Sequence, residues 1–461
     1  MSFPASRFSR LAAITALGLL AVAQTVIGLR LAADTNWDTD LFDQGAYLAM
    51  AGKLADAVYP SMTDGTRNPL FPWLAAKVLD SNSPDFFAAG KRLNIFLAAA
   101  GAFLIGVAGL GRLGGLAAWN LSAVAGLGCL IPIGTFFGAE VLFYLFFFGL
   151  WVGGFAFLRE PHAGTAALAG LAGGLAYLAK PSTGPFLGLL AVAVVATAFL
   201  VVINKKWPTW VAVEGWNPRA ALGGLALLFA VSIAVSSPRL AYSANTFGSP
   251  FYSLPSFWFW ADNWEDCVNK YANCTPSVLA SMPEEDRPTA ANYFRRHGLG
   301  HALARGLSGT AIKLQQLLDP DRKPFWKAEK RGKPRSFVFP LRGEVLVGLG
   351  FLAVVLVALG KFEIVRRPGF VPSAALAVAA FGLYAGAYGW YHVIGPGFRF
   401  ILMFYIPLLW TFLCTAHEVV GTRIVSSMVF TVANVLLGVI VIWRLGVLLT
   451  DGGFQKVAYA F

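Results

Sequence analysis

The sequence predicts an all-α polytopic membrane protein with about 11 transmembrane helices. Of its 461 residues, 57% are hydrophobic and only 13% are charged, whereas a soluble domain carries about 25% charged residues. The mean hydropathy is +0.63. Apolar runs of about 20 residues, the length that a helix needs to cross a bilayer, recur along the chain. Because these runs are unbroken and do not alternate with polar residues, they exclude a membrane β-barrel.

The apolar runs define the predicted spans. Their approximate bounds are 11–31, 94–111, 116–134, 140–158, 164–179, 185–203, 220–238, 343–360, 371–390, 400–416 and 425–443. Ala21-Val22-Ala23 resembles a signal-peptide cleavage site. However, the first run is long for a signal peptide, and the alternation of loop charge requires it, so we interpret it as an uncleaved span.

Basic residues in the short loops predict the orientation. They occupy every second loop: Arg7 and Arg10, then Arg112, Arg159, Lys205 with Lys206 and Arg219, Lys361 with Arg366 and Arg367, and Arg423. Cytoplasmic loops carry such an excess, so the N-terminus is predicted to be cytoplasmic and the C-terminus outside. These loops and the 322–335 run also explain much of the net charge of +12. Basic residues beside anionic lipid headgroups account for this charge better than a nucleic-acid partner does.

Three parts follow from this topology. Residues 1–238 form an N-terminal transmembrane module that contains the first outer loop, residues 32–93. Residues 239–342 form a long outer segment, and residues 343–461 hold the C-terminal transmembrane helices. Within the long segment, residues 283–318 are expected to be helical.

The long outer segment is rich in aromatic residues and holds two of the four cysteines. Trp258 and Trp260 belong to an aromatic run that can stack on sugar faces or form an interfacial belt. Cys267 and Cys274 can close a small disulfide loop in an oxidising compartment. A metal site at this pair is disfavoured, because no histidine or further cysteine accompanies it.

The first outer loop concentrates the acidic residues. Asp34, Asp38, Asp40 and Asp43 lie within ten residues. A short helix is predicted from Gln44 to Val58, since Tyr47, Ala51, Leu54 and Val58 recur on one face. Gly65 and the prolines at 69 and 72 then break the helical pattern.

This loop resembles the first outer loop of GT-C superfamily membrane glycosyltransferases. The pattern is Asp43-Gln44-Gly45-Ala46-Tyr47, then Ala51, then Arg67-Asn68-Pro69-Leu70-Phe71-Pro72. It is most similar to protein O-mannosyltransferase-like and lipid A aminoarabinose transferase-like enzymes. The resemblance implies that Asp43 is the catalytic acid of the family's acidic pair. The second member, usually Glu in the family, is Gln44 here.

Four further residues are candidates for the same site. Glu140 resembles an acidic residue that GT-C enzymes often have at the start of this span, although a carboxylate there also satisfies a helix dipole. Lys180 matches a Lys-Pro of the family, and it can equally be a snorkelling interface lysine. Arg399 resembles the arginine of a Gly-x-Arg-Tyr/Phe pattern and suits a phosphate or a lipid headgroup. His392 is either an acceptor-side ligand or a structural residue.

Together these features imply a glycosyltransferase that uses a polyprenyl-phosphate-linked sugar. Asp43 would be the base that activates an acceptor hydroxyl, with Asp40 as the alternative base or a metal ligand. Lys180, Arg399 and Arg67 would hold the donor phosphate, and Tyr47 and Glu140 would contact substrate. The acceptor would be a lipid, glycan or protein. The sequence requires no cofactor and allows a divalent cation between Asp40 and Asp43.

The resemblance also implies a location. The enzyme would be an integral protein of the bacterial inner membrane, surrounded by membrane lipids, with its active site on the outer face. Direct attack by the acceptor predicts inversion at the anomeric carbon. No phosphate loop, HExxH or GxSxG pattern points to another reaction.

Two alternatives remain at this stage. A transporter or flippase would also have many spans with charged groups, but its ionisable groups usually lie near mid-membrane and its halves often repeat. Here the charges gather at one face, and the sequence shows no repeat. The other alternative is a non-catalytic assembly protein whose long outer segment binds partners.

Overall fold

The computed structural model describes residues 7–40, 43–56, 62–203, 215–272, 274–318, 342–359, 363–367, 369–395, 397–420 and 424–450. Several basic loop residues of the orientation argument lie outside these ranges. They are Lys205, Lys206, the 322–335 run, Lys361 and Arg423.

A helix occupies each predicted span, which confirms the all-α membrane class. The spans are α1 (Arg7–Asp34), α4 (Phe86–Leu113), α5 (Gly115–Ala125) continuing through a π-helical turn (Gly126–Leu130) into α6 (Ile131–Gly134), α7 (Glu140–Arg159), α8 (Ala163–Ala179), α9 (Gly184–Ile203), α10 (Pro218–Phe247), α15 (Arg342–Leu359), α16 (Phe370–Trp390), α17 (Tyr405–Val420) and α18 (Ile424–Leu449). Within the described residues, nine of these segments are long and apolar enough to cross a membrane. The remaining two, α8 and α15, have 17 and 18 residues.

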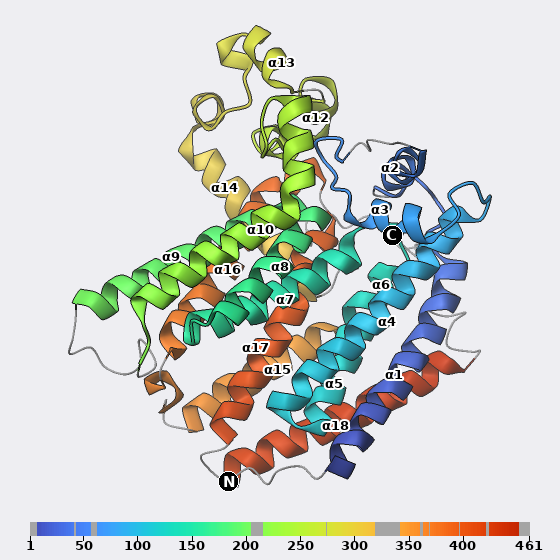
Figure 1. Cartoon of the computed structure of the whole chain (residues 1–461), viewed down its shortest axis with the longest axis vertical. Coiled ribbons are helices and arrows are strands. Elements are labelled where there is room, and N and C mark those ends of the chain that lie inside the picture. Colours follow the sequence, from blue (N-terminus) through green and yellow to red (C-terminus); the bar gives the residue numbers. More distant parts are fainter. Residues whose placement is uncertain are drawn as a thin grey trace.

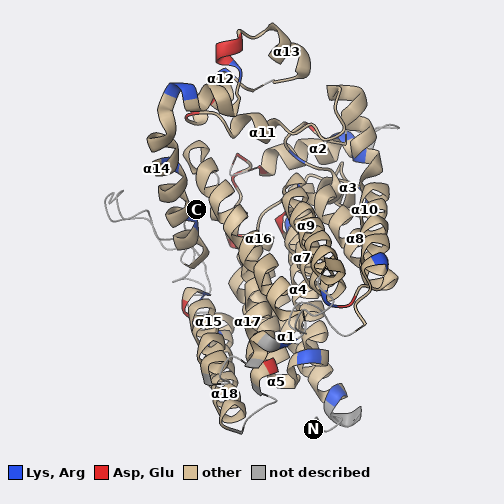
Figure 2. Cartoon of the chain, turned by 90° about the vertical axis from the view of Figure 1, so that its left-hand side faces the viewer, with Lys and Arg blue, Asp and Glu red and all other residues tan. Residues whose placement is uncertain are grey.

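Short helices gather at one end of the bundle, which we call the loop end (Figure 1). These helices are α2 (Gln44–Asp56), α3 (Leu70–Val78), α11 (Leu254–Trp258), α12 (Trp264–Asn269) and α13 (Pro276–Ser281). They belong to the two segments that the sequence predicted to lie outside the membrane. Charged residues lie mainly toward the two ends of the molecule, with long uncharged stretches of helix between them (Figure 2).

Helix α10 runs past the predicted start of the long outer segment. The sequence placed this boundary at residue 239, but the helix runs on to Phe247 through Pro238. It ends at Gly248, whose φ of 75° is the left-handed conformation that often terminates a helix. The predicted helix at 283–318 also begins later. α14 spans Ala290–Leu318, and it bends at Gly298, where φ is 72°.

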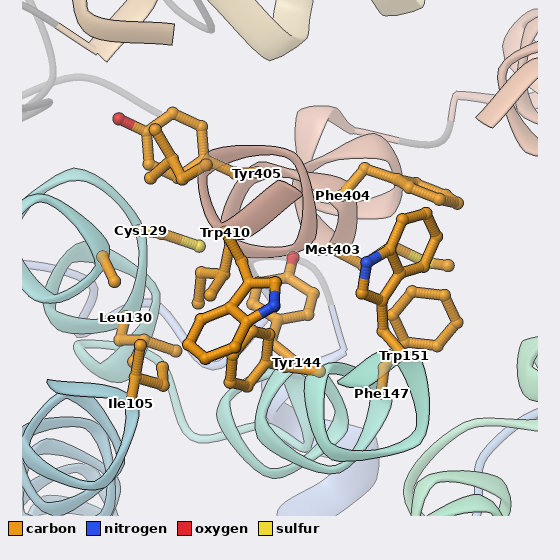
Figure 3. Packing of buried hydrophobic residues seen from close by; sticks show 14 of the residues in the cluster. Ile105, Cys129, Leu130, Tyr144, Phe147, Trp151, Met403, Phe404, Tyr405 and Trp410 are labelled. Carbon is orange, nitrogen blue, oxygen red and sulfur yellow. The ribbon is translucent and has the colours of Figure 1, made fainter. Parts of the chain in front are cut away.

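The core between the membrane helices is strongly aromatic (Figure 3). Phe147 and Trp151 of α7 pack against Phe186 of α9 and Phe404, which directly precedes α17. The Phe147–Phe404 centroids are 5.5 Å apart in an edge-to-face arrangement, a favoured geometry for aromatic pairs. This contact joins α7, in the N-terminal part of the chain, to the segment before α17, in the C-terminal part.

Helices α8 and α10 approach closely along a glycine-bearing face of α8. A Cβ added at Gly170 would lie 2.5 Å from the Leu228 carbonyl oxygen, so only glycine fits there. Ser232 Oγ of α10 donates a hydrogen bond of 2.8 Å to the Gly170 carbonyl. Small residues and serine hydroxyls commonly mediate helix contacts in membranes.

Arg239 joins α10 to both loop-end segments. Its side chain is buried, with 1% exposed. The guanidinium donates to Asn68 Oδ1 (3.2 Å), Tyr177 Oη (3.0 Å) and the Pro250 and Tyr252 carbonyl oxygens (2.9 and 2.7 Å). Arg239 therefore fixes the start of the long outer segment against the first outer loop.

Replacing Arg239 by Met is expected to lower the free energy of unfolding by about 3 kcal/mol or more. Each buried acceptor left without a donor costs about 1 kcal/mol or more. Thermal unfolding in detergent would measure the loss. Arg219→Met is the matched control, because Arg219 lies exposed at the other end of α10. Equal stability of the two variants would contradict the role of Arg239.

Topology can be tested by labelling single cysteines in a chain lacking the native four. Asn82→Cys and Ser277→Cys place exposed thiols in the two loop-end segments, and Ala163→Cys places one at the start of α8. An impermeant maleimide added outside intact cells is expected to label the first two and spare the third. Labelling of residue 163 alone would invert the predicted orientation.

Candidate functional site

Five charged residues meet at the loop end: Asp43, Arg67, Glu140, Lys180 and Arg399. We call them the charge cluster. The sequence proposed each of them separately, from segments up to 356 residues apart. The structure brings all of them into a single network of ion pairs.

Asp43 lies between two arginines. Arg67 Nη2 and Nε approach Asp43 Oδ1 at 2.7 and 3.2 Å. Arg399 Nη2 donates to the other oxygen, Oδ2. The described contacts of the Asp43 carboxylate include no hydrogen bond to the first turn of α2. The side chain therefore serves the charge cluster and does not cap the helix.

Glu140 joins the other two cations. Its Oε1 accepts from Lys180 Nζ at 2.7 Å and from Arg399 Nη1 at 3.1 Å. Arg399 thus bridges Glu140 and Asp43 with its two terminal nitrogens. The Glu140 and Arg399 side chains are 6% and 12% exposed. Buried charges of this kind are tolerated only when they are paired, as these are.

Three residues of the cluster lie at or near the ends of helical elements. Glu140 opens α7, and Lys180 directly follows α8, where Pro181 disfavours helical backbone at the preceding residue. Arg399 lies in the 3₁₀ turn Phe398–Phe404 that leads into α17. The Tyr144 hydroxyl of α7 donates to the Arg399 carbonyl and ties this turn to α7.

Arg67 is positioned by a tight turn between α2 and α3. Asp64 Oδ1 accepts from the Thr66 and Arg67 backbone N–H groups, and Asp64 Oδ2 accepts from Arg67 Nη1 at 2.7 Å. Gly65 has φ of 86°, and a Cβ there would lie 2.8 Å from the Tyr252 ring. The turn therefore needs glycine both for its backbone conformation and for contact with the long outer segment.

A pocket opens beside the charge cluster. Asp43, Tyr47, Glu140, Phe398 and Arg399 line it, together with residues of the turn before α7. Tyr47 is 2% exposed. Burial raises the pKa of Tyr47, and the nearby carboxylates of Glu140 and Asp43 raise it further. Tyr47 therefore stays protonated and can donate a hydrogen bond into the pocket.

The cations hold Asp43 in its ionised form. Burial alone would raise the pKa of this carboxyl, but Arg399, Arg67 and Lys180 together lower it well below its usual range. Since the folded pKa lies below the unfolded value near 4, the ion pairs stabilise the fold fully above about pH 4. This stability is lost as the pH falls through the folded pKa.

The Tm difference between the wild type and Asp43→Asn is therefore expected to stay constant from about pH 8 to about pH 5. It should shrink below about pH 4, where the unfolded carboxyl takes up its proton. Thermal unfolding at a series of pH values would measure it. A Tm difference that changes between about pH 7 and pH 5 would place the folded pKa of Asp43 above its unfolded value, against this account.

Asp40 and His392 are not part of the charge cluster. Asp40 is exposed, and its backbone N–H donates to Asp38 Oδ1 at 2.9 Å. His392 lies in a 3₁₀ turn after α16, with Nδ1 2.8 Å from the Gly389 carbonyl oxygen. In the described part of the chain, neither side chain contacts a residue of the cluster.

Trp258 and Trp260 are not part of the charge cluster; they belong to a set of packed aromatic side chains in the long outer segment. The Trp258 indole donates to the Tyr271 carbonyl at 3.0 Å, and the Trp260 ring packs edge-to-face on Trp390 at 5.8 Å. Arg305 lies 4.6 Å from the centre of the Trp390 ring. The Trp258 contact lies within the long segment, whereas Trp260 and Arg305 pack on Trp390 at the end of α16. A role of the two tryptophans in substrate binding stays a prediction.

Cys267 and Cys274 are buried in one small hydrophobic cluster with Tyr252 and Tyr271. The structure records both as free thiols. Their disulfide stays a prediction.

No group of three or more His, Cys, Asp or Glu side chains that could hold a metal occurs among the described residues. A divalent cation between Asp40 and Asp43 would have to compete with the arginines, because both oxygens of Asp43 already accept from them.

Sequence reasoning missed three contributors to the site. Gln44 is buried, its amide nitrogen donates to the Asp38 carbonyl (2.8 Å), and its oxygen accepts from Phe137 N–H (2.8 Å). A glutamate could not make the first of these bonds, which explains the amide at this position. Asp64 orients Arg67, and the Phe400 ring lies 5.0 Å from Lys180 Nζ. The sequence could have indicated Asp64, because it precedes Gly65 as the first residue of a turn. No sequence pattern pointed to Phe400.

The helical arrangement and the charge cluster define a polytopic membrane protein with its polar site at one end of the bundle. No family model matches the sequence, and neither does any curated protein. Solved structures do match. The archaeal oligosaccharyltransferase AglB from Archaeoglobus fulgidus, in complex with an inhibitory peptide and a dolichol-phosphate, superposes with a TM-score of 0.51 and 13% identity. The alignment covers 99% of this chain and 57% of AglB.

Another structure of the Archaeoglobus fulgidus oligosaccharyltransferase, tethered to an acceptor peptide containing the NVT sequon, has a TM-score of 0.48 and 12% identity. This alignment covers 99% of this chain and 56% of the oligosaccharyltransferase chain. The AglB match shows that this chain shares the fold of a membrane oligosaccharyltransferase, in agreement with the fold that the resemblance of the first outer loop implied. This chain spans little more than half the length of AglB.

Proposed function

We propose that this protein is a membrane glycosyltransferase that moves a sugar from a polyprenyl-phosphate donor to an acceptor hydroxyl. The observation that carries the proposal is the charge cluster, in which three cations pair with two carboxylates, Asp43 and Glu140, at one end of a helical membrane bundle. The AglB structure was solved with a dolichol-phosphate, which is a polyprenyl-type lipid phosphate. A shared fold with such a protein supports the same ligand class here.

The cations suit the leaving group. During transfer, the bond between the anomeric carbon and the donor phosphate oxygen breaks, and the electron pair leaves with the polyprenyl phosphate. Lys180 and Arg399 would stabilise the charge that develops on that oxygen. Arginine is well suited to this task because its planar fork makes paired, charged hydrogen bonds.

Asp43 would take the proton of the acceptor. The acceptor oxygen forms the new bond to the anomeric carbon from the face opposite the phosphate, which inverts the configuration. Its proton passes to Asp43, so that atoms and charges balance. General-base catalysis of this kind contributes about 10²–10⁴-fold.

Donor binding would also adjust the strength of the base. A carboxylate whose pKa is held very low is a weak base. A phosphate that binds to Lys180 and Arg399 would compete with Asp43 and Glu140 for these cations and would neutralise part of their charge. The pKa of Asp43 would then rise toward its ordinary value, so that the base becomes effective when the donor is in place.

The remaining assignments belong to the same proposal. Residues 1–238 would hold most of the catalytic site, and the 239–342 segment would contribute Trp258 and Trp260 to binding of the sugar or acceptor. The active site would face outward from a bacterial inner membrane. The acceptor would be a lipid, a glycan or a protein.

Binding of polyprenyl phosphate tests this proposal without knowledge of the sugar or the acceptor. The purified protein in nanodiscs would be titrated with undecaprenyl phosphate and, as the matched ligand, with the unphosphorylated polyprenol. We expect saturable binding of the phosphate only. Lys180→Gln should weaken it by about tenfold or more, since a charged hydrogen bond contributes about 1.5–3 kcal/mol.

Lys91→Gln is the control variant, because Lys91 is a buried lysine at the same end whose ammonium donates to the Thr35 carbonyl. Equal affinity for the phosphate and the alcohol would contradict the proposal. Movement of the lipid across the membrane without any sugar transfer would favour the transporter alternative.

A further inference from the structure

A second polar pocket lies at the end of the bundle opposite the charge cluster. It has a volume of about 450 Å³ and is lined by the ends of α4, α7 and α17 and the start of α8. Arg159 lies 19 residues along α7 from Glu140, which corresponds to about 28 Å along the helix axis. That distance matches the hydrocarbon thickness of a bilayer. The second pocket therefore lies at the other membrane interface.

The mouth of this pocket is lined by both positively and negatively charged side chains. Arg112 makes no ion pair in the described part of the chain, and its side chain is exposed. Arg159 Nη1 lies 3.1 Å from Glu418 Oε1, and both side chains are about one-third exposed. Among the residues that the structure describes, His417 Nδ1 is buried and has no hydrogen-bond partner. Glu160 and His162 also line the mouth, with His162 Nε2 3.9 Å from Glu160 Oε2, so that the lining contains two arginines and two carboxylates.

An apolar cleft continues from this mouth toward the middle of the membrane. It shares Arg112, Arg159 and Glu418 with the polar pocket. Its other walls are apolar or small residues of α7, α16 and α17, among them Trp151, Ala374 and Trp410. Trp151 and Trp410 are visible in the aromatic core (Figure 3). A polar mouth that leads into an apolar cleft matches the shape and polarity of an amphiphile.

We propose that this pocket and cleft bind one zwitterionic phospholipid from the leaflet opposite the charge cluster. The phosphate would lie against Arg112 and Arg159 and accept from His417, and the ammonium would lie against Glu418 and Glu160. An acyl chain would fill the cleft beside Trp151 and Trp410. This inference rests on the membrane fold alone and stands whether or not the proposed transfer reaction is correct.

The balance of charges selects the headgroup. A purely anionic lipid would bring its phosphate to the arginines but would leave Glu160 and Glu418 facing a second negative charge or nothing. A phosphoethanolamine headgroup places a positive and a negative group within a few bonds of each other. It therefore complements two arginines and two carboxylates that lie side by side, as Arg159 and Glu418 do.

Native mass spectrometry with mixed lipids tests this inference. The protein would be delipidated in micelles containing equal amounts of phosphatidylethanolamine and phosphatidylglycerol. We expect the wild type to retain one phosphatidylethanolamine. The fraction of the double variant Arg112→Gln/Arg159→Gln that retains this lipid should be at least tenfold lower. Arg219→Gln removes an exposed arginine that does not line the pocket, and it should retain the lipid as the wild type does.

A second pair of variants tests the cleft without changing charge. Ala374→Phe fills the cleft and should release the lipid, whereas Ala375→Phe, at the exposed neighbouring position of α16, should not. Circular dichroism and Tm would confirm that all variants fold. Equal retention of phosphatidylethanolamine by the wild type, the double arginine variant and Ala374→Phe would overturn the site. Preferential retention of phosphatidylglycerol would overturn the zwitterionic headgroup.

Discussion

Asp43→Asn is expected to reduce sugar transfer by about 10²-fold or more while the protein still folds. Asparagine has almost the same shape as aspartate and can still accept a hydrogen bond from Arg67 or Arg399. It cannot take up the proton of the acceptor. The assay would follow release of polyprenyl phosphate from a labelled polyprenyl-phosphate sugar in membranes that contain the native acceptor.

Two other substitutions control for the loss of charge in this loop. Asp64→Asn removes the other carboxylate that pairs with Arg67, and Asp40→Asn removes an exposed acid outside the charge cluster. Asp40→Asn is expected to keep activity within a few fold of the wild type, and Asp64→Asn to lose less activity than Asp43→Asn, because Asp64 acts only by orienting Arg67. If Asp43→Asn transferred sugar at the wild-type rate, Asp43 would not be the base, and Glu140 would be the next carboxylate to test.

Arg399→Gln is expected to lower kcat/KM by about 10²–10³-fold, as removal of one preorganised electrostatic group typically does. Arg399 alone contacts both carboxylates of the cluster, so its loss leaves Asp43 and Glu140 with fewer cations and removes a donor to the leaving phosphate. Single-turnover measurements at varied donor concentration would separate weaker binding from slower chemistry.

Arg399→Lys distinguishes the shape of the guanidinium from its charge. Lysine keeps the positive charge but cannot reach two oxygen atoms in the same plane. We therefore expect activity between that of Arg399→Gln and the wild type. Full activity of Arg399→Gln would show that the leaving phosphate does not depend on this residue.

The sequence predicted the membrane architecture because hydrophobic length is a strong signal. Each apolar run of about 20 residues must form a helix, since unpaired backbone groups are too costly in lipid. The same topology explains why the cluster residues could be proposed individually. Asp43, Glu140, Lys180 and Arg399 all lie at helix ends on the same predicted face, so the antiparallel path of the chain brings them together.

The pairing inside the cluster could not be predicted. Nothing in the sequence indicates that Arg399 would reach Asp43 and Glu140 at once, or that Asp43 would be partly buried while Asp40 is exposed. These contacts depend on the crossing of helices far apart in the chain. The extension of α10 past Pro238 was also hidden, because proline usually marks the end of a helix.

The most direct test of the central claim is a structure with undecaprenyl phosphate bound in a nanodisc. We expect its phosphate within hydrogen-bond distance of Lys180 and Arg399, beside Asp43, with the Arg399–Asp43 or Lys180–Glu140 contact lengthened to admit it. The lipid chain should leave the site between the membrane helices. A phosphate bound elsewhere, with all four ion pairs of the charge cluster unchanged, would contradict the account.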